Sequence, residues 1–272
     1  MSRKFEKPEQ YVFRSNNGEK FKLLAVSPHK TNPLCVLVVA SHTTTSGAYK
    51  KDEVLLLQAR AEGGLLLSTR VATSPKPLVF LIWDLVPWVT EQRHQQVHEL
   101  IITATGENIL INQFRDEVLV PQCRLSCGVP VTACVMQRWL PRIVYAGGAG
   151  AGKIDLIFNK SKIEINNVLQ FPPWMKEDKK LCFLSIGCVE NKSEVLLGDS
   201  EGKIYLFGVP QCTVATVGEK FTILRDMTVP FPVNALAVAP QGRGLSTLKV
   251  VAVGVSGNAR LAGGGANVRY SL

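Results

Sequence analysis

A repeated pair of apolar strands, joined by a turn that contains glycine, is the feature that most constrains how this chain folds. The paired segments are rich in Val, Ile, Leu, Tyr and Phe, as strands prefer. Glycine near the turn supplies the positive φ that a tight hairpin needs. Four clear copies span residues 99–114, 142–158, 194–207 and 249–261, and a looser first copy joins 36–41 to 53–58. Each copy predicts a β-hairpin, and residues 92–100 are the one short helical candidate.

The turn glycines recur at a spacing that fits a four-stranded repeat. Gly106, Gly152, Gly202 and Gly257 are separated by 46, 50 and 55 residues, and a unit of four strands takes about 40–50 residues. Strands expected before the hairpins lie at 21–28, 131–136, 181–186 and 233–240. We expect the small and apolar residues of 131–136, 181–186 and 233–238 to be buried in inner or central strands. Strands expected after them lie at 65–71, 118–125, 162–169 and 221–224. The sequence therefore predicts an all-β array over residues 21–272, after an N-terminal extension at 1–20.

Three segments resemble the WD-repeat class of β-propellers. The run V-N-A-L-A-V-A-P-Q-G at 233–242 is similar to the inner strand and turn of such repeats, and 196–207 to their middle hairpin. Leu81 to Leu85 looks like the third strand with its Trp-Asp ending, at Trp83 and Asp84. One Trp-Asp pair is present and the Gly-His of the family is absent, so the resemblance is degenerate. It implies a propeller-like array of about five recognisable four-stranded blades, incomplete or with degenerate blades. An open ring would leave strand edges that a partner chain could complete. Trp83 is expected in the core.

Composition argues against a disordered, membrane-spanning or secreted chain. Apolar residues make up 46% of the chain and charged residues 19%, which is too apolar for disorder. No apolar run reaches the ~18 residues of a spanning helix, and the first ten residues carry no apolar segment like that of a secretory signal. Seven cysteines, mostly inside apolar runs, predict free thiols in the reducing cytoplasm or nucleus. They are Cys35, Cys123, Cys127, Cys134, Cys182, Cys188 and Cys212.

A glycine-rich segment at 147–153 matches the pattern of a phosphate-binding loop. That chemistry needs Ser or Thr after the lysine and a helix behind the loop. Ile154 follows Lys153 instead, and the next residues alternate like a strand. We therefore expect a hairpin turn without bound nucleotide.

A zinc site is the second chemical alternative. His94 and His98 are four apart, and Cys123 and Cys127 have a spacing that structural zinc sites tolerate. The histidine pair would need a helix that the sequence supports only weakly, so exposed histidines and buried thiols are expected. No G-x-S-x-G hydrolase signature is present either. We expect no catalytic residue, no metal and no cofactor.

Tryptophans beside proline or charge are the candidate partner contacts, because Trp and Arg dominate interface energetics. We expect Trp88, Trp139 and Trp174 to lie in loops, divided between local packing and contact with a protein partner. The candidate partner-binding set is Trp88, Arg138, Trp139, Arg142, Trp174, Lys176, Lys179 and Lys180.

The chain is basic, with a net charge of +9. From residue 227 to the last residue no Asp or Glu occurs. Candidate contacts there with nucleic acid or another acidic partner are Arg243, Lys249, Arg260 and Arg269. The alternative is that a moderate basic excess only aids solubility.

Together these features predict a non-enzymatic scaffold or adaptor subunit, which mediates protein–protein interactions in a multiprotein complex. The rival is a nucleotide-exchange factor for a small GTPase. Residues 233–244 and 250–256 loosely resemble the closing repeat of the membrane-anchored propeller of the early secretory pathway, which has that activity. The relative ends in a membrane anchor, whereas this sequence ends at Leu272 without one, so the scaffold is the leading expectation.

Overall fold

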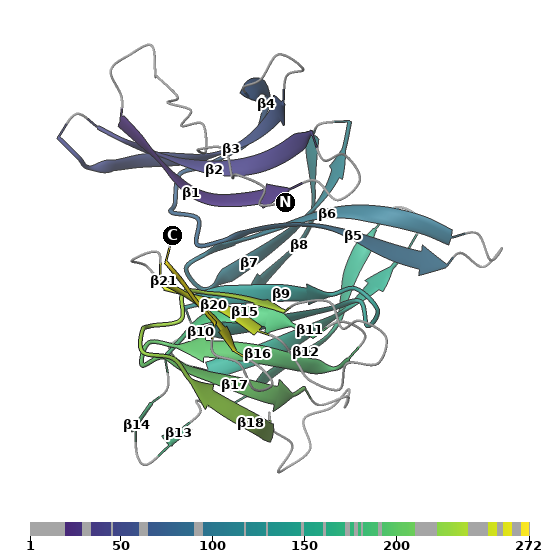
Figure 1. Ribbon diagram of the computed structural model, residues 1–272. Helices are drawn as coiled ribbons and strands as arrows, with labels where there is room; N and C mark the ends of the chain where they lie inside the picture. The colour runs from purple at the N-terminus through teal and green to yellow at the C-terminus, as the bar shows by residue number, and fades with distance from the viewer. Residues whose placement is uncertain are drawn as a thin grey trace, which may run out of the picture. The chain divides into compact units, whose positions relative to one another are not determined.

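The computed structural model describes residues 20–28, 34–44, 46–59, 65–89, 95–116, 118–128, 130–147, 150–159, 162–171, 175–176, 179–180, 182–189, 192–209, 222–238, 250–254, 258–262 and 268–271. Every regular element in these ranges is a β-strand (Figure 1). The predicted all-β class is therefore confirmed. The chain divides into two compact units, Met1–Pro77 and Leu78–Leu272.

The first unit holds one antiparallel sheet whose strands pair in chain order. Its strands are β1 (Lys20–Pro28), β2 (Cys35–Thr43), β3 (Tyr49–Ala59) and β4 (Leu65–Ser74). The register pairs Leu37 with Leu56 and Val39 with Val54, and all four side chains are buried. The looser first hairpin of the sequence is thus β2–β3.

The second unit holds four antiparallel sheets of four strands, each again in chain order. The first contains β5 (Leu81–Val89), β6 (Gln95–Thr105), β7 (Asn108–Arg115) and β8 (Val118–Ser126). The second contains β9 (Ala133–Gln137), β10 (Arg142–Gly147), β11 (Gly150–Phe158) and β12 (Ile163–Phe171). The third contains β15 (Phe183–Cys188), β16 (Glu194–Asp199), β17 (Lys203–Gly208) and β18 (Thr222–Thr228). The fourth contains β19 (Ala235–Val238), β20 (Val250–Val253), β21 (Asn258–Ala262) and β22 (Val268–Ser271). A two-stranded ladder, β13 (Met175–Lys176) and β14 (Lys179–Lys180), lies between the second and third sheets in the sequence.

The four clear hairpins of the sequence are the central strand pairs of these four sheets. Gly106 and Gly202 have φ of +57° and +85° at their turns, as tight hairpins require. Gly152 differs from the prediction, because it lies inside β11 opposite Tyr145 and not in the turn. A Cβ there would meet the Tyr145 ring at 2.3 Å, so close packing requires that glycine. Gly257 lies outside the described residues.

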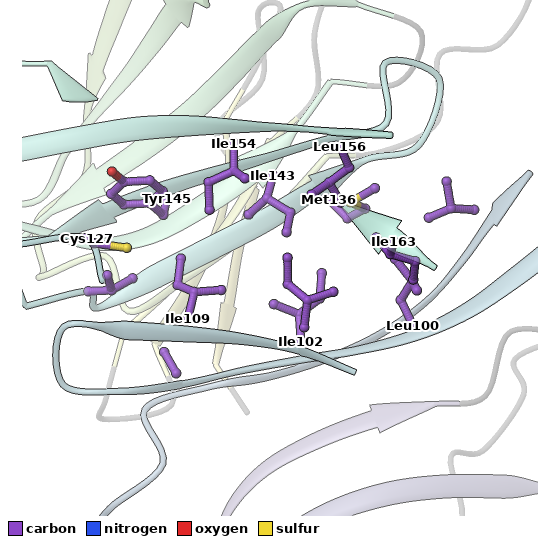
Figure 2. Packing of buried hydrophobic residues seen from close by; sticks show 14 residues of the cluster. Leu100, Ile102, Ile109, Cys127, Met136, Ile143, Tyr145, Ile154, Leu156 and Ile163 are labelled. Atoms are coloured by element: carbon purple, nitrogen blue, oxygen red, sulfur yellow. The ribbon is translucent and has the colours of Figure 1, made fainter. Parts of the chain in front are cut away.

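Neighbouring sheets of the second unit pack face to face through apolar clusters. Figure 2 shows the first cluster, in which Leu100 and Ile102 of β6 pack with Ile143 and Tyr145 of β10. The intervening residues of β10, among them Val144, belong to a second cluster with the third sheet. Because successive side chains point to opposite faces, β10 is buried on both sides. The second sheet therefore lies between the first and the third, and the sheets pack one after another in chain order.

A third cluster joins the third and fourth sheets. Leu196 of β16 and Ile204 of β17 pack there with Val250 and Ala252 of β20. Burying each of the Leu, Ile and Val side chains contributes about 1.5–3 kcal/mol. The serial packing therefore makes the second unit one stack of four sheets.

Four local expectations need correction. The segment with Trp83 and Asp84 is the first strand of its sheet, β5, and not a third strand. Residues 95–100 of the helical candidate lie in strand β6. Residues 233–238 are not buried throughout, because Ala235 and Ala237 of β19 are exposed. Within the described part of the second unit, the sheet that contains β19 packs against the third sheet, and that contact covers its other face. The strand β22 was missed.

Trp83 itself is in the core, as expected. Its side chain is buried, and its ring packs edge-on against Phe114 with 5.4 Å between the ring centroids. Its Nε1 donates a hydrogen bond of 2.6 Å to Glu99 Oε1. The polar edge of the indole is therefore satisfied within the sheet.

Candidate partner-binding surface

The turn between β9 and β10 presents an arginine and a tryptophan next to each other. The Arg138 side chain is 44% exposed, and Trp139 is partly exposed. Leu140 N donates to Gln137 O at 3.2 Å, and Leu156 N donates to Pro141 O at 2.9 Å. These two backbone hydrogen bonds tie both ends of the turn to the sheet, so the exposed pair stands on a rigid support. We call Arg138 and Trp139 the turn pair.

An ion pair fixes the turn from the neighbouring sheet. Arg138 Nε lies 2.6 Å from Asp84 Oδ1 of β5, whose side chain is 9% exposed. The same Asp84 oxygen accepts a hydrogen bond from Leu85 N at 2.8 Å. The carboxylate therefore holds the guanidinium in one orientation while part of that side chain stays open to solvent.

Arg142 lies in the interior and not beside the turn pair at the surface. Its side chain in β10 is buried, and its Nε lies 2.5 Å from Asp155 Oδ1 of β11. Lys153 Nζ lies 3.3 Å from Asp155 Oδ2 and is fully buried. Two cations thus share one carboxylate on the side of β10 and β11 that also carries Val144. The sequence did carry a signal for this burial. Successive side chains of a strand alternate between its two faces, so Arg142 shares a face with the apolar Val144.

The remaining tryptophans and lysines of the candidate set are only partly placed. Trp88 lies in strand β5 opposite Gln96, and not in a loop. Trp174 lies outside the described residues. Lys176 pairs with Lys179 in the β13–β14 ladder. In the same ladder Met175 pairs with Lys180.

The basic C-terminal candidates fall into two groups. Arg243 and Lys249 lie outside the described residues. Arg260 of β21 and Arg269 of β22 are direct partners in the register of the fourth sheet. The sheet therefore brings together two basic residues that are nine positions apart in the sequence.

The glycine-rich segment forms the β10–β11 hairpin, in which Gly147 pairs with Gly150. Lys153 lies within β11 and its side chain is fully buried. A strand follows the turn where a phosphate loop would lead into a helix. The geometry is that of the expected hairpin.

The residues of the zinc alternative serve other contacts. His98 is buried in β6, with Nδ1 2.7 Å from Gln113 Nε2, so the expectation of exposed histidines is wrong at this position. Its ring stacks on Phe158 at 5.3 Å between centroids. Cys123 Sγ donates to Ile163 O at 2.8 Å, and Cys127 is buried. His94 lies outside the described residues. Among the described residues no group of three or more His, Cys, Asp or Glu could hold a metal ion.

Two buried carboxylates make structural contacts, and sequence reasoning missed the one at Glu53. Asp199 Oδ1 accepts hydrogen bonds from Glu201 N and Lys203 N, at 2.9 and 2.8 Å, and so closes the β16–β17 turn. Glu53 in β3 lies 2.6 Å from Lys51 Nζ and 2.8 Å from His42 Nε2. The signal for Glu53 was an acidic residue inside an apolar strand, where a charge needs a partner.

The contacts of Glu53 change the pKa of its carboxyl group. Burial by itself raises the pKa of its carboxyl, but the hydrogen bond from Lys51 and the nearby charges of His42, Lys51 and Arg70 outweigh it. The net pKa is lower than usual. The carboxylate is thereby held in its charged form within the sheet.

Comparison with models of known protein families and with curated proteins gives no match for this chain. Within the described residues, no helix has the length and apolar character needed to cross a bilayer. The turn pair is the part of the candidate set whose side chains are both described and accessible.

Proposed function

We propose that the chain is a non-enzymatic scaffold subunit of a multiprotein complex, built as a degenerate WD-repeat-like β-propeller with five four-stranded blades. The turn pair carries this proposal. Arg138 and Trp139 stand on a turn held by two backbone hydrogen bonds and by Asp84. A pre-positioned aromatic and arginine lose little conformational entropy when a partner binds. Trp and Arg are also the residues that contribute most to interface affinity.

The stacked sheets supply the frame that such a subunit needs. Apolar clusters join each sheet of the second unit to the next. Function on a rigid frame of this kind lies in turns and faces, since the fold itself specifies none. The scaffold would work inside the cell, in the cytoplasm or the nucleus, where free thiols such as the buried Cys127 persist.

The basic excess points to acidic partners. A net charge of +9 favours association with an acidic protein surface or with nucleic acid. Lys176, Lys179, Lys180, Arg260 and Arg269 are the described positions proposed to contribute. If phosphates are the partner, affinity falls steeply as salt rises, whereas an apolar protein interface depends on salt only weakly.

Partner recovery with the tagged full chain tests the proposal. Trp139→Ala and Arg138→Ala should each reduce recovery of the native complex, with the larger loss at Trp139. Tyr49→Ala and Arg124→Ala are matched controls, because both side chains are exposed on other sheets. Undiminished recovery with the folded Trp139 and Arg138 variants would contradict the proposal.

The rival function has its own assay. The purified chain is added to a panel of small GTPases loaded with a fluorescent nucleotide. Accelerated nucleotide release by any member would favour the exchange factor, and unchanged release would favour the scaffold.

A further inference from the structure

Polar side chains from three adjacent strands lie together inside the second sheet. The register pairs Arg142 of β10 with Gln137 of β9 and with Asp155 of β11. Directly paired residues lie on the same side of a sheet, and Lys153 shares that side because it is two positions from Asp155 on β11. Gln137 and Lys153 are fully buried, and Arg142 is 4% exposed. We call Gln137, Arg142, Lys153 and Asp155 the buried polar group.

The buried polar group lies on the side of the second sheet that packs against the third. Val144 and Ala151 are on that side, and both belong to the apolar cluster shared with the third sheet. Gln137 Nε2 also donates a hydrogen bond of 3.3 Å to the backbone oxygen of Lys192, which lies between β15 and β16. The group is therefore part of the contact between the two sheets.

Within the described residues, one nitrogen of Arg142 has no acceptor. Arg142 Nε lies 2.5 Å from Asp155 Oδ1, whereas Asp155 Oδ2 lies 3.3 Å from Lys153 Nζ. An arginine that pairs with both oxygens of one carboxylate satisfies two of its nitrogens. Here the second oxygen is next to the lysine, and Arg142 Nη1 is buried without a hydrogen-bond partner in the described part of the chain. Burial of a charged donor without an acceptor is costly.

An anion would compensate Arg142 better than a water molecule. Gln137 Oε1 is also buried without a hydrogen-bond partner among the described residues, so a water between it and Arg142 Nη1 would satisfy both atoms. A water adds no charge, however, and the carboxylate of Asp155 is divided between Arg142 and Lys153. A buried cation is stabilised by a close counter-charge. The arrangement therefore favours a negative ion beside Arg142.

We propose that Arg142 Nη1 binds a chloride ion at the contact between the second and third sheets. Chloride is a single atom and accepts hydrogen bonds from any direction, which suits a nitrogen enclosed by packed side chains. Phosphate or sulfate would need several donors and more room than a closely packed interior offers. The Asp155 side chain is 13% exposed, so the buried polar group lies near the surface and can exchange a small ion with solvent.

This site is separate from the turn pair and goes beyond the scaffold function proposed above. Chloride would act as a structural ligand, and the stability of the stacked sheets would depend on its concentration. A ligand that binds only the folded state lowers the equilibrium constant for unfolding. The proposal can therefore be tested on the purified full chain without any partner protein.

Urea unfolding at a series of chloride concentrations is the first test, with gluconate replacing chloride so that the ionic strength stays constant. All four tryptophans lie in the second unit, so their fluorescence follows the unfolding of that unit. Each tenfold rise in chloride above its dissociation constant should lower the equilibrium constant for unfolding about tenfold. A constant that does not change across the physiological range of chloride would overturn the proposal.

Arg142→Met is the second test, because it removes the proposed chloride ligand and leaves Lys153 paired with Asp155. The folded variant should lose the chloride dependence. Arg124→Met is the matched control, since it removes the same side chain from an exposed position on β8, where Arg124 Nε lies 3.3 Å from Asn108 Oδ1. It should keep the full dependence. Chloride dependence that persists in Arg142→Met, or disappears in Arg124→Met, would overturn the proposal.

Crystals of the unmodified protein grown in bromide provide a test that needs no variant. Bromide replaces chloride and is located by its anomalous scattering. We expect an anomalous peak within hydrogen-bond distance of Arg142 Nη1. A water at that place, no density there, or a peak at the surface from an adventitious ion only would each overturn the proposal. None of these outcomes depends on partner recovery, so the chloride site and the scaffold function can fail separately.

Discussion

Arg138 Nε lies 2.6 Å from Asp84 Oδ1, across the boundary between the first two sheets of the second unit. Asp84 belongs to β5, and Arg138 follows β9. The ion pair therefore joins two sheets that also pack through an apolar cluster and are linked by hydrogen bonds between Ile163 and both Gln122 and Cys123. It also sets the orientation of the arginine beside Trp139, so one contact serves both the stack and the proposed partner surface.

Arg138→Ala and Asp84→Asn should each lower the free energy of unfolding by about 1 kcal/mol or less. The arginine is close to half exposed, and solvent-exposed ion pairs are worth about 0–1 kcal/mol. A double-mutant cycle by urea denaturation measures the coupling. We expect the double variant to lose less than the sum of the single losses. Strict additivity would show that the pair contributes nothing.

Gly198→Ala should destabilise the second unit by about 1–3 kcal/mol, as overpacking does. A Cβ at Gly198 in β16 would lie 2.5 Å from Val233 Cγ1 and 2.6 Å from Ser185 Oγ. Gly208→Ala is the matched control, because a Cβ there meets Leu224 at an ordinary 3.7 Å. Thermal unfolding of the two variants should separate them, and equal melting temperatures would contradict this account of the third sheet.

The strands of this fold could be read from the sequence because they follow local rules. Alternating apolar residues and turn glycines predicted the hairpins that include Gly106 and Gly202, and both have positive φ. Gly152 broke the rule for a reason that is not local. The Tyr145 ring occupies the space a side chain would need, and the spacing of glycines carries no information about a cross-strand ring.

The faces of the strands could not be predicted as well. Arg142 looked like a surface cation beside Trp139, but its side chain is buried and pairs with Asp155 on the next strand. Ala235 and Ala237 looked buried because they are small and apolar, yet they are exposed. Which sheet covers a given face depends on how sheets stack, and a strand's own pattern shows only that it has two apolar sides.

Asp155→Asn should lower the free energy of unfolding by about 3–5 kcal/mol, because it leaves two buried cations without their carboxylate. Arg142 and Lys153 both depend on Asp155, at 2.5 and 3.3 Å. Glu164→Gln on β12 is the control, since its Oε2 makes only an exposed 3.5 Å contact with Asn159 Nδ2. Chemical denaturation should show a large loss for the first variant and almost none for the second. Similar losses would mean that Asp155 is not the charge partner of the group.

Cys127 should resist alkylation in the native protein. Burial raises the pKa of its thiol to about 11, although hydrogen bonds to Tyr145 and to backbone near Ile109 oppose the shift. The thiolate is the reactive form, so at pH 8 only about one Cys127 in a thousand would be ionised. Iodoacetamide labelling followed by peptide mass spectrometry should modify the partly exposed Cys188 before the buried Cys127. Labelling of Cys127 at the same rate as Cys188 would contradict the buried position.

The stability of the second unit should fall as the pH drops below neutrality, because of His98. Burial lowers the pKa of this histidine, and the nearby Arg115 charge lowers it further, while a backbone hydrogen bond with Asn159 partly opposes both. The unfolded chain therefore binds a proton at a higher pH than the folded chain does. Stability rises with pH wherever the unfolded state binds more protons. The loss on acidification begins near the unfolded value of about 6.5 and continues down to the lower folded pKa.

His98→Gln should flatten this dependence between pH 7.5 and pH 5.5, because glutamine does not titrate and keeps an amide beside Gln113. The window avoids Glu53, whose pKa lies below its usual range. That carboxylate stabilises the fold above its unfolded pKa and loses its contribution only as the pH falls through the lower folded value. Urea midpoints measured at half-unit steps give the slope for each chain. A variant whose slope equals that of the unmodified protein would show that another group carries the pH dependence, and that the proton on His98 is bound equally in the folded and unfolded states.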